Sequence, residues 1–469
     1  MSENTKIKIL NNERKFILSP TANLSIILKI KGNISEEELK MAIISVSKKH
    51  PLLRARIEFN QDGEAYFVVT QDIIPEMKVN NKIKEDDWMT AIHKEYKIPM
   101  NYIKGPLIRI VLLKGADSSD LILYCQHSIC DGTALAYLGK DIMEALGNPN
   151  LEFKEVPTAR LKSELLGIED NKEKGLKTKI FNVIIKKLNN KWMKERIRFN
   201  YEDYINLCYS VFDRYRLDSI LLDFNMEQTR NLIEKCGNYG VTLNSAYTCA
   251  FLFAYNSIFH NFKKKSASLA IPYDLRNRLK EEIGETFSLL VGSISFDFKY
   301  KQYSESDFWM VTKELHQMIT NRMNKYDIFG AAVFLNKVHP EIMDTLSFIS
   351  NGHLVSSGTE TSKKISELMS NKKGIAVKIG NKFKNELPEI INTNLGGLKF
   401  KQKYGDLLLD NMIFIPPTSF SLTLVIGAVG VSGKSVVSIN YFKDLKEPDE
   451  EYENKLLEIK NKVLYLLNK

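Results

Sequence analysis

The sequence predicts an α/β protein built from two domains. The chain has 469 residues, which is more than one ordinary hydrophobic core organises. Apolar residues make up 44% and charged residues 26%, as in typical globular domains. Segments of helical periodicity alternate with β-forming runs, and the order helix, strands, helix recurs loosely in both halves. We expect an N-terminal domain over 1–165, a basic amphipathic linker over 166–210 and a C-terminal domain over 211–469.

The first half reads as one complete α/β unit that ends near residue 150. Ser35 and Glu38 form a capping box, and the apolar residues after them predict a helix to about Lys49. The remaining elements of this unit are expected as strands over Leu52–Phe59, Ala65–Thr70, Pro106–Leu113 and Leu121–His127, and as helices over Trp88–Tyr96 and after Gly132.

A second unit begins near Tyr215. Thr242 is a helix cap, and Asn392–Leu398 is expected to form a turn. The other elements are predicted as helices over Met226–Cys236, Leu243–Ile258, Ser304–Asn324 and Pro448–Leu467, and as strands over Ser268–Ile271, Leu289–Phe298, Phe420–Val429 and Ser435–Tyr441.

The cysteines and the N-terminus indicate a cytoplasmic protein. The five cysteines are odd in number, widely scattered and without a CxxC pair, which argues against a disulfide framework and a structural zinc site. The N-terminal residues lack the apolar core of a signal peptide, and no apolar run reaches the length of a membrane span. We therefore expect no bound metal and no transmembrane segment.

The net charge of +9 is concentrated in one segment. Residues 171–200 contain ten Lys or Arg and two acids, a balance of +8, so the rest of the chain is nearly neutral and a nucleic-acid partner is not expected. Ile180, Ile184, Leu188 and Trp192 share one helical face there. One interpretation is a linker helix with a solvated basic side; the other is a docking surface for a carrier protein, coenzyme phosphates or a membrane surface.

His127 is the candidate catalytic residue. The apolar run that starts at Leu121 predicts a strand that ends in this histidine, and Asp131-Gly132 supplies a tight turn before the next helix. A strand end aims a side chain rigidly, and an imidazole with a pKa of about 6.5 can serve as a general base. The alternative is a buried histidine that only completes hydrogen bonds.

The residues also carry a family resemblance. His127–Gly132 matches the HxxxDG signature of the chloramphenicol acetyltransferase-like superfamily, which includes condensation domains of nonribosomal peptide synthetases and alcohol O-acetyltransferases. Four further segments resemble the superfamily's RHxxLR, PLxR, PxDLR and SNxG segments in the same order: Lys49–Arg56, Gly105–Arg109, Ile271–Arg276 and Asn394–Gly396. Gln126 replaces the first histidine of peptide-forming condensation domains, so the chain is more similar to the O-acyltransferases. The DFGWG loop of the plant enzymes is absent from the sequence.

The resemblance implies a fold and a reaction. Two chloramphenicol acetyltransferase-like α/β sandwich domains would form a V-shaped pseudo-dimer, with His127 in a tunnel between them. An acyl group would pass from a thioester donor to a hydroxyl or amine without a covalent acyl-enzyme. The donor, acyl-CoA or a phosphopantetheinyl carrier protein, would be a co-substrate, and no cofactor would stay bound.

The resemblance also implies roles for other residues. Asp131 would pair with an arginine and fix the loop, with Arg276 the first choice of partner and Arg54 the second. Gly132 would leave the tunnel open beside His127 and offer its N–H to an oxyanion. Asn394 and Gly396 are the expected contacts to the oxyanion or the substrate from the second domain.

Three other functions stay open at this point. One is a free-standing condensation enzyme fed by acidic carrier proteins. Another is a non-catalytic ligand-binding scaffold with the same fold. The last is a thiol enzyme that uses Cys125 or Cys130, although no third orienting group is evident.

Overall fold

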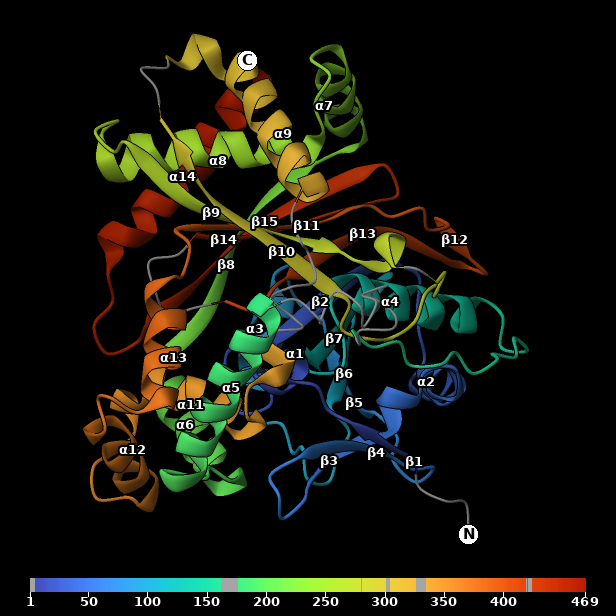
Figure 1. The fold of residues 1–469 in the computed structure, drawn as a ribbon. Coiled ribbons are helices and arrows are strands. Elements are labelled where there is room, and N and C mark those ends of the chain that lie inside the picture. Colours follow the sequence, from blue (N-terminus) through green and yellow to red (C-terminus); the bar gives the residue numbers. More distant parts are fainter. Residues whose placement is uncertain are drawn as a thin grey trace.

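The computed structural model describes residues 5–161, 176–279, 281–300, 304–325, 335–418, 420 and 424–469. The chain forms a mixed α/β structure with two six-stranded sheets and one small sheet (Figure 1). The strand orders are β12-β13-β2-β7-β6-β5, β10-β9-β11-β14-β15-β8 and β1-β4-β3. The two large sheets agree with the predicted α/β fold.

The first half contributes most of one large sheet. The central strands β2 and β7 are antiparallel, with Asn23 opposite Gln126 and Lys31 opposite Ser118. Their side chains are almost fully buried. The elements of this half are β1 (Thr5–Lys8), α1 (Asn11–Arg14), β2 (Asn23–Lys31), α2 (Glu36–Lys49), β3 (Ala55–Phe59), β4 (Ala65–Val69), β5 (Glu76–Asn81), α3 (Asp87–Tyr96), β6 (Ile108–Lys114), β7 (Ser118–Gln126) and α4 (Gly132–Gly147).

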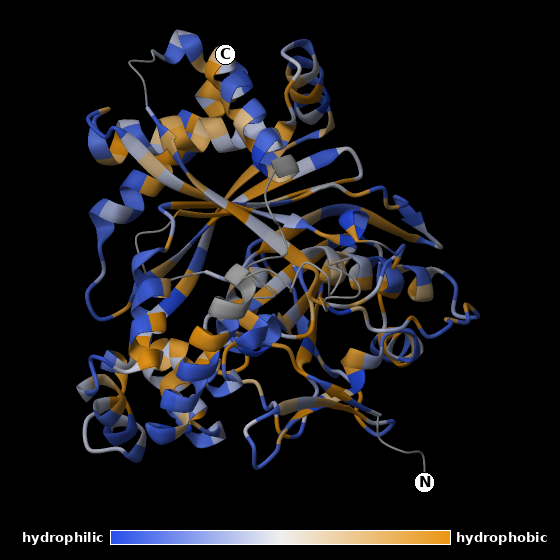
Figure 2. Cartoon of the chain, viewed as in Figure 1, coloured by the Kyte–Doolittle hydropathy of each residue, from blue (hydrophilic) through white to orange (hydrophobic). Residues whose placement is uncertain are grey.

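The second half forms the other large sheet, which α8, α9 and α14 cover in the upper part of Figure 1. Figure 2 shows polar and apolar residues side by side on these helices, as expected of elements that bury one face. The elements from residue 176 onward are α5 (Leu176–Lys194), α6 (Tyr201–Arg214), β8 (Tyr215–Phe224), α7 (Met226–Asn238), α8 (Leu243–His260), β9 (Ser266–Asp274), β10 (Val291–Lys299), α9 (Phe308–Lys325), α11 (Pro340–Asn351), α12 (Glu360–Ser370), α13 (Ile375–Asn385), β11 (Ile390–Gly397), β12 (Lys403–Tyr404), β13 (Leu407–Ile415), β14 (Leu424–Val431), β15 (Lys434–Asp444) and α14 (Glu450–Asn468).

Two strands of the second half, β12 and β13, lie in the sheet of the first, and β13 makes the direct contact. β13 pairs antiparallel with β2, from Leu408 opposite Lys31 to Ile415 opposite Ser25. β13 also has close neighbours in β14 and β15 of the other sheet. The predicted domain boundaries at 165 and 210 stay predictions, but the two halves are joined through this strand as well as through the linker.

The helix and strand predictions hold for most elements, with two corrections. The strand predicted over Leu52–Phe59 begins only at Ala55, because Pro51–Arg54 forms a 3-10 turn that Pro51 initiates. The segment predicted as a turn, Asn392–Leu398, is largely strand β11. Its polar Asn392 is tolerated inside the sheet because its amide donates to Asn244 Oδ1 (3.0 Å) and Thr248 Oγ1 (2.6 Å) on α8.

The basic segment forms a helix whose buried face includes Leu188 and Trp192, as predicted, but has Ile185 in place of Ile184. On α5, Ile185 and Trp192 are buried, whereas Ile184 is 49% exposed. Lys186 and Lys187 are exposed. The side chain of Ile180 and the charges at 172 and 174 lie outside the described residues. Within the described part of the chain, no helix is both long and apolar enough for a membrane span.

The short helix α1 is anchored by a buried ion pair. Arg14 donates from Nε to Asp344 Oδ1 (2.8 Å) and from Nη2 to Oδ2 (2.6 Å), and both side chains are less than a tenth exposed. Burial raises the pKa of Asp344 in spite of Arg14, so the pair is costly to desolvate. It fixes the position of α1 against α11 more than it adds stability.

Removal of one partner of this pair leaves an uncompensated buried charge. We expect Arg14→Met to lower the free energy of unfolding by about 3–5 kcal/mol, measured by chemical denaturation. The control is Lys6→Met, which breaks the exposed Lys6–Glu58 pair and should cost less than about 1 kcal/mol. Equal losses in the two variants would contradict the anchoring role of Arg14.

Candidate active site

His127 is held at the end of the central strand β7. Its backbone N–H donates to Ala22 O (3.2 Å), which continues the pairing of β7 with β2 by one residue. On the preceding residue, Gln126 Nε2 donates to Ile17 O (3.2 Å) and the side chain is buried. The histidine therefore stands on a rigid backbone, as the strand and turn pattern predicted.

The hydrogen bonds of His127 fix its tautomer. Nδ1 lies 2.7 Å from Cys130 O. A carbonyl oxygen only accepts, so Nδ1 carries the proton and Nε2 keeps a lone pair. The side chain is only partly buried. Nε2 is thus in the state required of a general base.

The surroundings of His127 keep the ring neutral. Burial lowers its pKa to about 4, and this effect exceeds the opposite influence of the Cys130 carbonyl and the Asp131 carboxylate. The charge of Lys15 lowers the pKa further. At neutral pH the imidazole can accept a proton, although a base of low pKa drives that transfer less strongly than one matched to the pH.

Asp131 joins the histidine turn to the second half of the chain. Its Oδ1 accepts from Ala134 N (2.8 Å) and so caps helix α4. Its Oδ2 accepts from Leu290 N (2.7 Å) and from Arg276 Nη1 (3.0 Å). Both carboxylate oxygens are engaged, and Arg276, the expected partner, is the arginine that contacts them.

Arg276 is itself held by several acceptors. Nη1 also donates to Asp274 Oδ1 (2.8 Å), and Nη2 donates to Thr286 O (3.2 Å) and Ser288 O (3.1 Å). The second choice of partner, Arg54, is wrong. Arg54 donates to Ser47 O (3.0 Å) and to Glu155 Oε2 (3.3 Å), both in the first half, because the turn at 51–54 directs it there.

Gly132 is required by packing between the halves. A Cβ at this position would lie 2.7 Å from Phe414 Cζ of β13 and 2.8 Å from Leu395 Cδ2 of β11. The missing side chain thus makes room for these two residues, which the sequence did not indicate. As the first residue of α4, Gly132 also has an N–H at the helix N-terminus, where intrahelical acceptors are lacking.

Asn394 and Gly396 lie at the end of β11. Gly396 N donates to Asn394 Oδ1 (2.7 Å), and Gly396 has a φ of +75°, which favours glycine. Leu395 is the residue of this segment that contacts Gly132. Contacts from Asn394 and Gly396 to an oxyanion or substrate stay a prediction.

Two residues beside His127 were missed from the sequence. The Phe16 ring centroid lies 4.3 Å from that of His127, with the planes tilted by 34°. Lys15 Nζ lies 4.7 Å from the centroid of Phe16. Both follow the short helix α1, far from the HxxxDG motif in the sequence, and nothing in their local pattern distinguishes them from ordinary loop residues.

The cysteines near His127 are unsuited to nucleophilic attack. Cys125 and Cys130 are buried, with their Sγ atoms 3.2 Å apart. Burial raises the pKa of the Cys130 thiol well above its usual value, which disfavours the reactive thiolate. No group of histidine, cysteine or acidic side chains suited to a metal ion occurs in the described residues.

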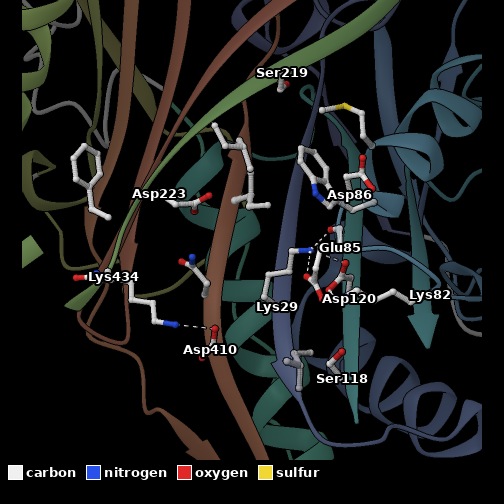
Figure 3. Close-up of a pocket in the computed structure, with 18 of the residues that line it drawn as sticks. Lys29, Lys82, Glu85, Asp86, Ser118, Asp120, Ser219, Asp223, Asp410 and Lys434 are labelled. Carbon is white, nitrogen blue, oxygen red and sulfur yellow. Dashed lines mark hydrogen bonds and ion pairs between the residues drawn. The ribbon is translucent and has the colours of Figure 1, made fainter. Parts of the chain in front are cut away.

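A separate cleft of about 900 Å³ lies between the two large sheets, away from His127 (Figure 3). Its lining includes Lys29, Lys31 and Ser118, at the opposite end of β2 and β7 from the histidine. Its lysines are paired with carboxylates: Lys29 with Asp120 (2.7 Å), Lys82 with Asp120 (3.1 Å), Lys31 with Asp410 (3.0 Å) and Lys434 with Asp410 (2.8 Å). An anionic ligand would therefore compete with a carboxylate for each of these lysines.

Comparison with solved structures gives matches over nearly the whole chain. The trichothecene 15-O-acetyltransferase of Fusarium sporotrichioides superposes with a TM-score of 0.63 at 10% identity, covering 98% of this chain and 95% of that one. The first condensation domain of the calcium-dependent antibiotic synthetase gives 0.60 at 12% identity, over 98% and 96%. Polyketide synthase associated protein 5 of Mycobacterium tuberculosis gives 0.58 at 14% identity, over 99% and 98%.

Curated relatives match over a shorter region. Equisetin synthetase of Fusarium heterosporum is 27% identical over 132 residues, which is 28% of this chain and 3% of the synthetase. Bacitracin synthase 3 of Bacillus licheniformis is 26% identical over 131 residues, 28% of this chain and 2% of the synthase. The chain thus matches only a few per cent of the length of these large proteins.

These solved structures show the fold that this chain shares with an O-acetyltransferase and a condensation domain. The family model described as alcohol acetyltransferase matches residues 55–371, more than half of the chain. The protein belongs to the alcohol acetyltransferase family.

The tautomer and neutrality of His127 can be checked directly. In an NMR titration, the His127 ring should protonate near pH 4 instead of near 6.5, and its Nδ1 should carry the proton above that pH. The signals of the His127 ring are assigned as those that disappear from the spectrum of His127→Ala. Because the unfolded chain takes up this proton at a higher pH, the folded state should lose stability as the pH falls from about 6.5 toward 4. A protonation midpoint of His127 between pH 6 and 7 would contradict the conclusion that the ring is desolvated.

The pairing of Asp131 with Arg276 predicts a specific energetic coupling. A double-mutant cycle with Asp131→Asn and Arg276→Met should give a coupling of about 1–3 kcal/mol in the free energy of unfolding. The matched cycle with Asp131→Asn and Arg54→Met should give less than about 0.5 kcal/mol, because these residues share no contact in the described structure. Similar couplings in both cycles would show that the ion pair does not hold the turn.

Proposed function

We propose that this protein transfers an acyl group from a thioester donor to a hydroxyl or amine acceptor, with His127 as the general base. The observation that carries the proposal is the Nδ1 hydrogen bond to Cys130 O, which leaves Nε2 as a proton acceptor on a rigid strand end. Membership of the alcohol acetyltransferase family supports the reaction class.

The proposed reaction proceeds without a covalent enzyme intermediate. Nε2 of His127 takes the proton from the acceptor as its oxygen or nitrogen attacks the thioester carbonyl. The tetrahedral intermediate then collapses, the C–S bond breaks, and the departing thiolate receives the proton from the same ring. The N–H of Gly132 is our candidate for an oxyanion donor, since it lies at the positive end of helix α4.

Acyl-CoA and an acylated carrier protein are both candidate donors. The relatives are synthetases of the nonribosomal peptide and hybrid polyketide type, and their condensation chemistry favours a carrier. The family described as alcohol acetyltransferase favours a small coenzyme thioester and a hydroxyl acceptor. The exposed Lys186 and Lys187 of α5 offer an acidic carrier or coenzyme phosphates a positive surface.

A cytoplasmic location is part of the proposal. All five cysteines are free and buried in the structure, as in proteins of reducing compartments. Acyl-CoA and carrier-bound thioesters would then be within reach of the enzyme.

The test measures thiol release and product mass with acetyl-CoA and, separately, with an acetylated phosphopantetheinyl carrier, against a panel of primary alcohols and amines. His127→Ala should lower turnover by about 10²- to 10⁴-fold, because a general base contributes that much. The control is His353→Ala, which removes an exposed imidazole. Thermal melts verify that both variants are folded.

Activity with acetyl-CoA alone would identify a coenzyme-dependent enzyme. Activity that requires the acetylated carrier would identify a carrier-dependent one. Turnover of His127→Ala close to that of the wild type would refute the assignment of the base. A wild-type protein that transfers acetyl from neither donor, but binds ligands, would be a scaffold instead of an enzyme.

A further inference from the structure

Lys15 is a cation near His127 for which the described residues supply no acidic partner. Its Nζ lies 4.7 Å from the Phe16 ring centroid, and that ring lies 4.3 Å from the imidazole of His127. In the described part of the structure its Nζ forms no hydrogen bond or ion pair. Burial lowers its pKa to about 8, and no carboxylate acts against this shift. The amine is nevertheless mostly protonated at neutral pH.

The buried cations in this half of the protein are matched by carboxylates, whereas Lys15 is partly buried. Arg14 pairs with Asp344 (2.6 Å), Arg109 with Glu95 (3.1 Å) and Arg160 with Glu13. Lys15 differs from them, since among the described residues the face of the Phe16 ring is the group that lies against its charge. Because a partly buried and unmatched charge is unfavourable, its presence near a reactive group points to an anion that arrives with a ligand.

The backbone around Lys15 is fixed on both sides. Arg14 is bonded to Asp344 of α11, and Ile17 O accepts the amide of Gln126, the residue before His127. These contacts fix the backbone next to Lys15 relative to the end of β7, which carries His127. A ligand group that contacts Lys15 would therefore have a defined position relative to Nε2 of His127.

The phosphate groups of the donor are poor candidates for this anion. The pantetheine arm separates its phosphate from the thioester sulfur, so a thioester placed at His127 holds that phosphate far from Lys15. The anion must instead belong to the part of the substrate that lies next to the reacting carbonyl. Carboxylate is the common anionic group of small acyl chains and acceptors.

We propose that Lys15 is a specificity-determining residue that binds a carboxylate of the substrate, carried either on the acyl group of the donor or on the acceptor. The inference rests on the proposed acyl transfer and narrows its substrate class. Nζ donates to the carboxylate oxygens, and no bond of the substrate changes at this position. The reaction yields an ester or amide that keeps a free carboxylate.

Two matched substrate pairs distinguish the source of the carboxylate. Succinyl-CoA is compared with butyryl-CoA for the acyl group, and 4-hydroxybenzoate with 4-hydroxybenzamide for the acceptor, with acetyl-CoA as its donor. The measured quantity is the ratio of kcat/KM for the anionic member to that for the neutral member. In Lys15→Met this ratio should fall roughly 10- to 100-fold in one of the pairs, as expected for a lost charged hydrogen bond.

Two further variants serve as controls. Lys15→Arg retains the positive charge and should restore much of the lost preference for the anionic member. Lys48→Met removes an exposed lysine of α2 and should leave both ratios unchanged. A fall in kcat/KM that is equal for the anionic and neutral members would overturn the proposal, because Lys15 would then act on the transition-state oxyanion that every substrate shares.

A binding measurement separates failure of this inference from failure of the proposed function. Calorimetric titration with 4-hydroxybenzoate, 4-hydroxybenzamide, succinate and butyramide requires no turnover. The wild type should bind at least one carboxylate more tightly than its neutral match, and Lys15→Met should lose that difference. If acyl transfer is absent but the binding difference is found, only the reaction is wrong. If the wild type favours neither carboxylate, the role of Lys15 is refuted whether or not acyl transfer occurs.

Discussion

The carboxylate of Asp131 is the contact on which the geometry of the site depends. One oxygen caps the helix that follows the histidine turn, and the other accepts from Arg276 and from the backbone of Leu290. The first contact belongs to the N-terminal half, and the other two belong to the C-terminal half. A single buried acid therefore sets both the shape of the loop that carries His127 and the position of the second half against it. An ion pair of this kind orients its surroundings more than it stabilises them.

Much of this arrangement could be predicted because local sequence patterns determine it. The apolar run before His127 and the Asp-Gly turn predicted a strand that delivers an imidazole, and the structure has it. The capping box at Ser35 and Glu38 likewise predicted the start of α2. Arg276 could be selected as the partner of Asp131 only through the resemblance of its segment to a known family, since the two residues are far apart in the chain.

Other features depend on tertiary contacts that leave no local signal. Phe16 contacts His127 and Lys15 lies against Phe16 because Arg14 holds α1 against α11, and neither residue stands out in the sequence. Gly132 was expected to keep a passage open, but its missing side chain admits Phe414 and Leu395 from the other half. Asn392 was placed in a turn together with the glycines that follow it, and its amide contacts with α8 explain its place in β11.

The position of β13 in the sheet of the first half has a consequence for how the chain can be divided into fragments. β2 is covered by β7 on one side and by β13 on the other. A fragment that ends before residue 403 would leave the unpaired backbone of a long apolar strand open to other chains, which favours aggregation. Separate expression of the two halves is therefore a poor strategy for this enzyme. A fragment that retains β12 and β13 keeps the backbone of β2 paired.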